Sequence, residues 1–164
     1  GLGDVYKRQT IENVHTKKVS TEFGEFRLDV WRDVIFDEHH FSLTKGTPEK
    51  VDVPMVRVQT QSVLQDTLGI DEIGKKWSIR KSLQKISEEG TGVFVLINHR
   101  DAKTYWLSSL KDENIEPKRN RRVIGIGSQI LRSLGLNRIN VLGTPTKYSG
   151  LSGFNIEIEG FIDE

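Results

Sequence analysis

The triplet His99-Arg100-Asp101 is a compact group of side chains that could transfer protons. Imidazole titrates near neutral pH, and a nearby carboxylate can orient it, so the triplet could serve general acid–base catalysis. It follows the apolar run 93–97, which is typical of a strand buried on both faces. A lone histidine at a strand end is more often a polar loop residue, and we therefore assign His99 no catalytic role.

Two glycine motifs approach nucleotide-binding patterns without meeting them. Residues 69–76, GIDEIGKK, differ by one residue from the P-loop pattern Gly-x4-Gly-Lys-[Ser/Thr], because Lys76 stands where a hydroxyl should bind Mg²⁺. Gly125-Ile126-Gly127 fails as a dinucleotide-binding pattern because Ile130 replaces its third glycine. Neither motif predicts a nucleotide site.

Composition and charge exclude further classes. The densest basic cluster is Lys118, Arg119, Arg121 and Arg122, but a short basic segment on a chain of net charge +1 is usually solvated, so nucleic-acid binding is not expected. No apolar run approaches about 18 residues, so we expect no membrane association. The chain has no cysteine, which excludes disulfides and thiolate metal sites and fits a cytoplasmic protein.

Apolar periodicity predicts the elements that would position any site. Phe26, Leu28 and Val30 alternate with their neighbours, which predicts a strand with one buried face. We predict further strands over 40–44, 55–59, 93–97, 138–142 and 154–158, helices that end at Gly90 and Gly135, a helix over 103–110, and a polar loop over 111–122. Strands outnumber helices without regular interleaving, which predicts a single α+β domain with a mixed sheet.

Three segments carry a resemblance to a known family. Residues 57–61, RVQTQ, with Asp66, Gly69 and the helix end 88–90, EEG, resemble the zinc-binding core of GTP cyclohydrolase II. Residues 21–26, TEFGEF, and 124–135, IGIGSQILRSLG, are similar to two further segments of that family. The resemblance implies an α+β fold in which helices flank a mixed β-sheet.

The resemblance also shows what is missing. The family's three zinc cysteines fall on Ser62, Ile73 and Lys75, none of which supplies a thiolate. We therefore expect no zinc and no other cofactor. The glycine-rich segment that binds substrate and phosphate in the family is replaced by bulky and polar residues over 98–107, including Tyr105 and Trp106.

The family's catalytic Asp-x-Arg corresponds here to Asn120-Arg121-Arg122. The resemblance implies that the family's aspartate acts as a proton acceptor and that its arginine attacks the α-phosphate. An amide cannot accept that proton at neutral pH, so cyclohydrolase catalysis is not expected. The resemblance leaves a candidate anion-binding remnant with weak affinity for phosphate or a nucleotide, formed by Arg57, Gln61, Arg122, Thr144 and Lys147.

Residues 1–9 lack a pattern tied to the rest of the chain and 10–20 resemble a linker, so we take 1–20 as a non-native or linker segment and 21–164 as the domain. The family implies a homodimer, with Trp31 and Trp106 as candidate packing residues, and an upstream 3,4-dihydroxy-2-butanone 4-phosphate synthase domain. The leading hypothesis is a catalytically inactive, structural or regulatory domain of riboflavin biosynthesis. Its alternatives are a metal-free enzyme acting on a nucleotide or sugar phosphate, and a nucleotide or phosphate sensor.

Overall fold

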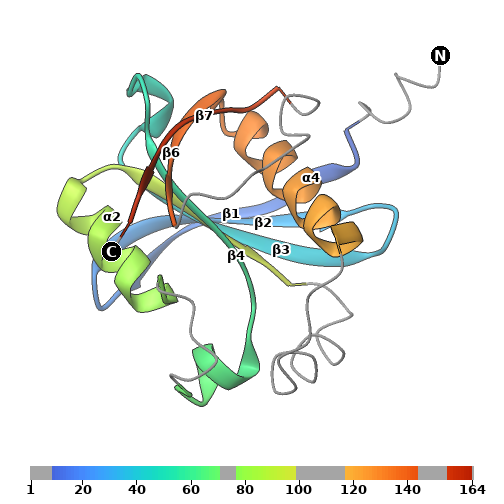
Figure 1. The fold of residues 1–164 in the computed structure, drawn as a ribbon, viewed down its shortest axis with the longest axis horizontal. Coiled ribbons are helices and arrows are strands. Elements are labelled where there is room, and N and C mark those ends of the chain that lie inside the picture. Colours follow the sequence, from blue (N-terminus) through green and yellow to red (C-terminus); the bar gives the residue numbers. More distant parts are fainter. Residues whose placement is uncertain (1–8, 71–76, 99–116, 144–154, 164) are drawn as a thin grey trace.

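A computed structural model describes residues 9–70, 77–98, 117–143 and 155–163. Within them one seven-stranded mixed sheet runs in the order β1-β2-β3-β5-β4-β6-β7 (Figure 1). The strands are β1 (Ile11–Thr21), β2 (Gly24–Asp33), β3 (Glu38–Lys45), β4 (Met55–Thr60), β5 (Gly92–Ile97), β6 (Arg138–Leu142) and β7 (Glu157–Ile162). The helices are α2 (Ile79–Glu89) and α4 (Pro117–Ser133), with the short turns η1 (Pro48–Lys50) and η2 (Val63–Thr67).

The sheet has an antiparallel half and a parallel half. Strands β1, β2, β3 and β5 pair antiparallel, whereas β4 pairs parallel with both β5 and β6, and β6 pairs parallel with β7. Helices are few and lie against this one sheet (Figure 1). The predicted α+β fold with a mixed sheet is confirmed.

Each helix covers one face of the sheet, and β5 lies between them. Val93, Val95 and Ile97 of β5 belong to the core cluster that contains Ile130 of α4. Phe94 points to the opposite face and joins a second cluster with Ile86 of α2. The run 93–97 is therefore buried on both faces, as its continuous apolar character predicts.

The ends of both helices follow from local chemistry. The Ser78 hydroxyl accepts a hydrogen bond from the backbone N–H of Lys81 and caps the start of α2. Gly90 ends that helix in the left-handed region, with φ of 84°, and Gly135 does the same after α4, with φ of 87°. Both predicted glycine stops are confirmed.

The second glycine of the pair, Gly127, serves packing. Both glycines lie in the middle of α4, and a Cβ added to Gly127 would stand 3.1 Å from Cγ1 of Val58 on β4. The missing side chain lets the helix approach the sheet closely. A mid-helix position also confirms that this motif is no strand-to-helix dinucleotide turn.

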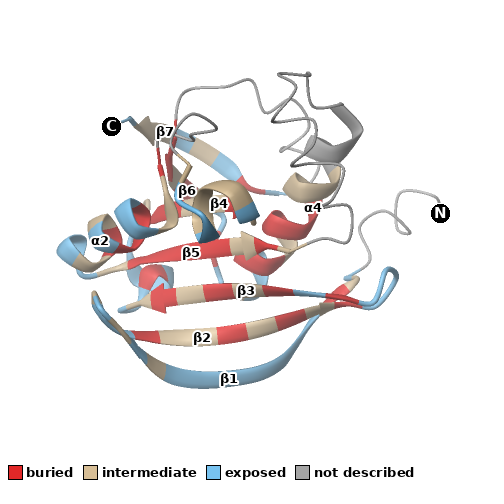
Figure 2. Cartoon of the chain, turned by 90° about the horizontal axis from the view of Figure 1, so that it is seen from below, coloured by how far each residue is buried: buried red, intermediate tan, exposed pale blue. Residues whose placement is uncertain are grey.

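The structure corrects the predicted start of the domain. Residues 11–20, assigned to a linker from the sequence, belong to β1 and pair with β2 from Ile11 opposite Asp33 to Thr21 opposite Gly24. Apart from buried Ile11 and the half-buried Val19 and Thr21, the residues of this strand are exposed, because it lies at the sheet edge (Figure 2). An exposed edge strand has no apolar alternation, which is why periodicity did not reveal it.

The burial of β2 also differs from expectation. Asp29, Trp31 and Asp33, on the face opposite to Leu28 and Val30, are buried, whereas Leu28 and Val30 are only partly buried. Trp31 lies in the core and its Nε1–H donates to Ser42 Oγ at 2.9 Å, so it is no surface residue for packing between subunits.

The predicted polar loop over 111–122 is wrong at its end, because α4 already begins at Pro117, a residue well suited to a first helical turn. The last strand begins at Glu157 instead of Phe154. The helix predicted over 103–110 lies outside the described residues.

Candidate functional site

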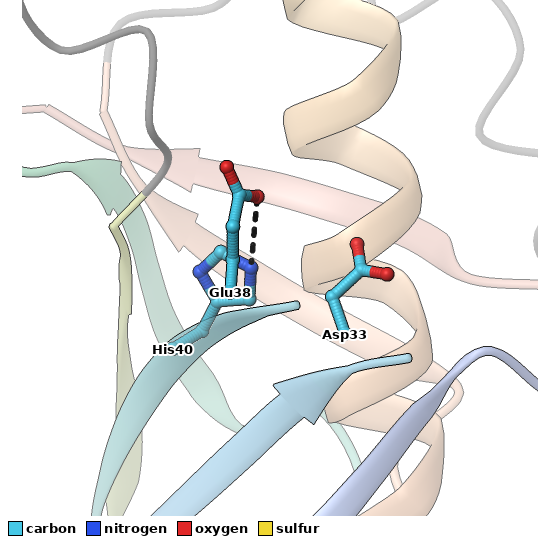
Figure 3. A group of neighbouring side chains, drawn as sticks. All are labelled: Asp33, Glu38 and His40. Carbon is cyan, nitrogen blue, oxygen red and sulfur yellow. Dashed lines mark ion pairs between the residues drawn. The ribbon is translucent and has the colours of Figure 1, made fainter. Parts of the chain in front are cut away.

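A buried group of charged side chains stands at the turn end of the β2–β3 hairpin. Asp33 ends β2 and Glu38 begins β3, and the two residues face each other in the antiparallel register. His40 lies two residues after Glu38 and so points to the same face of the sheet, the face that α4 covers (Figure 3). All three side chains are buried.

Backbone groups hold two members of this group in place. Asp33 Oδ1 accepts hydrogen bonds from the backbone N–H groups of Ile35 at 2.9 Å and Phe36 at 3.2 Å, which fixes the hairpin turn. His40 Nδ1 accepts from the backbone N–H of Asn98, at the end of β5, at 3.0 Å. A neutral imidazole that accepts at Nδ1 carries its proton on Nε2, which lies 3.9 Å from Glu38 Oε1.

Arg122 of α4 supplies the opposite charge. Its guanidinium forms an ion pair with Glu38, and its Nη2 lies 3.9 Å from Asp33 Oδ2. The guanidinium carbon also stacks 3.9 Å from the centre of the Phe36 ring. This arginine, which the resemblance placed in the anion-binding remnant, connects α4 to the β2–β3 hairpin.

The donor set of Asp33, Glu38 and His40 resembles a metal site, since one ligand atom from each lies within 4.8 Å of the others. Two carboxylates and an imidazole suit a divalent transition metal. Arg122, however, already brings a cation onto Glu38 and close to Asp33, and a metal ion there would have to displace it. We interpret the group as an internal charge network, with Arg122 in the role of the cation.

Ser62 stands at the first of the family's three zinc-ligand positions, and here it has a structural role. Ser62 caps η2, where its Oγ accepts from the backbone N–H of Gln65 at 3.3 Å. The backbone N–H of Ser62 in turn donates to Asp66 Oδ2 at 2.8 Å. A hydroxyl engaged in a helix cap, on a chain without cysteine, does not fit a zinc site. Ile73 and Lys75 lie outside the described residues.

Arg57 faces away from Arg122. Its neighbours on β4, Val56 and Val58, contact the cluster under α4, so Arg57 projects to the α2 face. There its Nη1 donates to the carbonyl of Leu142 at 3.0 Å and its Nη2 to the carbonyl of Trp77 at 3.2 Å. The Nε–H donates to Gln59 Oε1 at 3.1 Å. The sheet therefore separates the two arginines of the expected anion-binding remnant, and both are engaged with the protein.

The remaining predicted site residues are only partly placed. Gln61 directly follows β4, where its backbone N–H donates to the carbonyl of Ile97 at 2.9 Å. Asn120 falls in the first turns of α4, and its side chain is outside the description. His99, Thr144 and Lys147 also lie outside the described residues.

Sequence reasoning missed the buried carboxylates and His40. A signal was present: Glu38, His40, Ser42 and Thr44 are polar at every second position of β3, and all four are buried. Such a polar row would normally be assigned to the solvent face of a strand. Only the position of α4 shows that this polar row of β3 lies on the inner face of the sheet.

None of the helices in the described ranges has the length and apolar character needed to cross a membrane.

Comparison with known proteins gives a clear family. The model of the family "GTP cyclohydrolase II" matches residues 12–163. A 3,4-dihydroxy-2-butanone 4-phosphate synthase of Pseudomonas aeruginosa is 29% identical over 160 residues, which cover 94% of this chain and 44% of that protein.

A protein with the same name from Neisseria meningitidis serogroup B is 32% identical over 92% of this chain and 42% of its own length. The riboflavin biosynthesis protein RibBA of Cytophaga hutchinsonii is 31% identical over 84% of this chain and 38% of its own length. The chain thus spans less than half of the length of these curated relatives.

Among solved structures, the chain is similar to RibBX, a two-domain 3,4-dihydroxy-2-butanone 4-phosphate synthase from A. baumannii. The TM-score is 0.70 at 25% identity, and the match covers 99% of this chain and 45% of that one. The family match extends over nearly the whole chain, including the edge strand β1. The chain belongs to the GTP cyclohydrolase II family.

Proposed function

We propose that this chain is a GTP cyclohydrolase II-like domain that has lost cyclohydrolase chemistry and serves a structural or regulatory role beside a 3,4-dihydroxy-2-butanone 4-phosphate synthase domain in riboflavin biosynthesis. The observation that carries the proposal is the position of Arg122. The residue that corresponds to the family's attacking arginine is paired with Glu38 and stacked on Phe36. A guanidinium committed to a buried carboxylate is poorly placed to attack a phosphate.

The metal loop supports the same conclusion independently. Zinc polarises the attacking water in the family, and its thiolate ligands are absent from a chain with no cysteine. Ser62 has become a cap of η2 through its contact with Gln65. Together with Asn120 in place of the proton acceptor, the sequence lacks both the activated water and the base that the reaction needs.

Support for the linked synthase domain comes from the relatives. Those compared above carry the names of a synthase or of RibBA, and each is more than twice as long as the part that this chain matches. The similar solved structure is described as a two-domain synthase. We therefore propose that the working protein contains a synthase domain covalently attached to this one, and that riboflavin biosynthesis is its pathway.

The two alternatives receive less support from the described residues. A nucleotide sensor and a metal-free enzyme on a phosphorylated substrate both need cationic groups that converge on a ligand. Arg57 and Arg122 lie on opposite faces of the sheet and bind carbonyls and a carboxylate of the protein. Homodimer formation, implied by the family, stays a proposal.

The test uses the product of the whole reading frame that contains these residues. We expect it to form 3,4-dihydroxy-2-butanone 4-phosphate and to release neither formate nor pyrophosphate from GTP above background. A family member with an intact cysteine set is the positive control for GTP turnover. Release of both products from GTP by the purified protein would contradict the proposal, as would the absence of synthase activity.

The structural role needs a separate readout. Arg122→Ala should lower the temperature at which synthase activity is lost, because it loosens this domain without touching the synthase active site. Arg132→Ala, an exposed change on the same helix, is the matched control and should behave as the unmodified protein. Equal heat inactivation of the two variants would contradict a structural coupling between the domains.

A further inference from the structure

The tip of the β2–β3 hairpin carries three consecutive apolar side chains in an exposed position. Val34, Ile35 and Phe36 are 45%, 65% and 50% exposed. Turns of this kind are normally built from glycine, proline, asparagine, aspartate or serine. A cluster of exposed apolar residues where polar ones are the norm indicates a surface that contacts something. We call these three residues the apolar tip.

The apolar tip is held in a fixed shape. The Asp33 carboxylate accepts the backbone N–H groups of Ile35 and Phe36, and Asp37 adopts the left-handed region with φ of 51°. Arg32 Nε donates to Asp37 Oδ1 at 3.0 Å across the turn. Arg122 supports the Phe36 ring from the side of α4. A rigid apolar surface loses little conformational entropy on binding, which favours association.

The start of the described chain lies against the same tip. The backbone N–H of Val34 donates to the carbonyl of Thr10 at 3.0 Å. The backbone N–H of Thr10 donates to Gln129 Oε1 of α4 at 2.7 Å, so this point is also fixed to the helix. The first residues of β1 and the β2–β3 hairpin lie at one end of the sheet (Figure 2). The chain therefore enters the described part of the structure beside the apolar tip.

We propose that the apolar tip docks against the synthase domain that precedes it in the same polypeptide, an inference that rests on the proposed function. Size selects this occupant over a second copy of the chain. A stable dimer needs about 800 Å² of buried surface from each partner, far more than three half-exposed side chains provide. A linked domain is present at an effective concentration of about millimolar, at which a small apolar contact suffices.

Residues 1–164 contain no cysteine, so a single introduced cysteine can be labelled at a chosen site. In the full polypeptide, with any cysteine outside these residues replaced by serine, Ile35→Cys is labelled with a photoactivated cross-linker and the cross-linked peptides are identified by mass spectrometry. Leu68→Cys is the matched control, because Leu68 is an apolar residue with 63% exposure, next to η2 and away from the hairpin. We expect a several-fold higher yield of cross-links to the synthase domain from position 35.

Each outcome decides the inference. Similar yields from positions 35 and 68, or cross-links from position 35 only to a second copy of the tip, overturn the docking while synthase activity in the same sample leaves the proposed function intact. A polypeptide without synthase activity overturns both. As a second measurement, Ile35→Ser should speed proteolytic cleavage between the domains relative to Leu68→Ser, and equal cleavage rates count against the docking.

Discussion

Arg122 and Glu38 form an ion pair that joins the first half of α4 to the first residue of β3. Glu38 is buried, and Asp33 lies close enough to share the same guanidinium. The arginine thus balances two buried carboxylates that face each other across the β2–β3 hairpin. Removing it should take this positive charge away from both.

Arg122→Ala is therefore expected to lower the free energy of unfolding by about 2 to 4 kcal/mol, somewhat less than for a fully buried pair because Arg122 is 26% exposed. Arg122→Lys should recover part of the loss, since a point charge replaces the planar contact with Glu38 and Phe36. Urea unfolding followed by circular dichroism measures both. Arg132→Ala should change stability by less than about 0.5 kcal/mol. A similar cost for Arg122→Ala and Arg132→Ala would show that the ion pair does not stabilise the fold.

Purified protein is expected to contain no stoichiometric zinc. Thiolates are absent, and the Ser62 hydroxyl already caps η2. Elemental analysis by mass spectrometry after gel filtration gives the ratio of zinc to protein. A ratio near one zinc per chain that survives a chelator would contradict the expectation, and Asp33→Asn and His40→Ala variants would then show whether the hairpin cluster binds it.

Restoring the three cysteines should not restore catalysis. The triple variant Ser62→Cys, Ile73→Cys, Lys75→Cys supplies thiolates but leaves Asn120 in place of the proton acceptor and Arg122 paired with Glu38. We expect no pyrophosphate from GTP, measured by a coupled assay, in the triple variant or in the unmodified protein. Turnover by the triple variant alone would show that the missing zinc is the sole defect.

Nucleotide binding should be weak and unselective. Arg57 and Arg122 are engaged with the protein on opposite faces of the sheet, so calorimetric titration with GTP, ATP and inorganic phosphate should give dissociation constants on the order of 1 mM or weaker. Any binding that does occur should persist in Arg122→Ala, in contrast to the expectation from sequence alone. Tight binding with a preference for guanine over adenine would favour the sensor hypothesis.

The surface pair Arg138 and Glu159 gives a pH-dependent prediction. The side-chain hydrogen bond from Arg138, at 3.0 Å, and its positive charge lower the pKa of Glu159 below the usual glutamate value. A lowered folded-state pKa means a stabilising contribution that is present above the unfolded pKa and disappears as the pH falls through the folded one. In Arg138→Gln the pKa of Glu159, followed by NMR titration of its carboxyl carbon, should rise toward the usual value. High salt should reduce the difference in the pKa of Glu159 between the unmodified protein and Arg138→Gln. An unchanged pKa in the variant would show that Arg138 does not cause the shift.

The fold was largely predictable because its centre follows simple patterns. The run 93–97 and the helix from Ile79 to its stop at Gly90 have strong apolar periodicity and clear end signals. The edge strand β1 escaped because exposed residues carry no such period. The alternation placed Asp29 on the outward face, because a carboxylate in a strand is normally solvated. Its burial is made tolerable by Arg27 of the same strand and by Asn13 of β1, and the contact with Asn13 depends on a strand that the sequence did not predict.

The candidate site was less predictable than the fold. Matching Arg57 and Arg122 to family positions identified residues of the right type, but could not tell that alternation in β4 turns Arg57 to the face opposite α4. Nor could it show that Glu38, distant in sequence, approaches Arg122. Contacts between distant segments depend on the assembled sheet, and a single sequence does not encode them in a readable local pattern.

The position of β1 has a practical consequence for protein production. Expression from residue 21, the boundary that the sequence favours, would remove the strand that covers β2 and delete Ile11 from the core. The backbone of β2 would then become an unguarded edge, without the exposed Lys17 and Lys18 and the irregularity at Val14 that now discourage strand-to-strand association. Such a truncated product should precipitate, whereas a version that keeps Thr10 and its contact with Gln129 retains the natural border of the sheet.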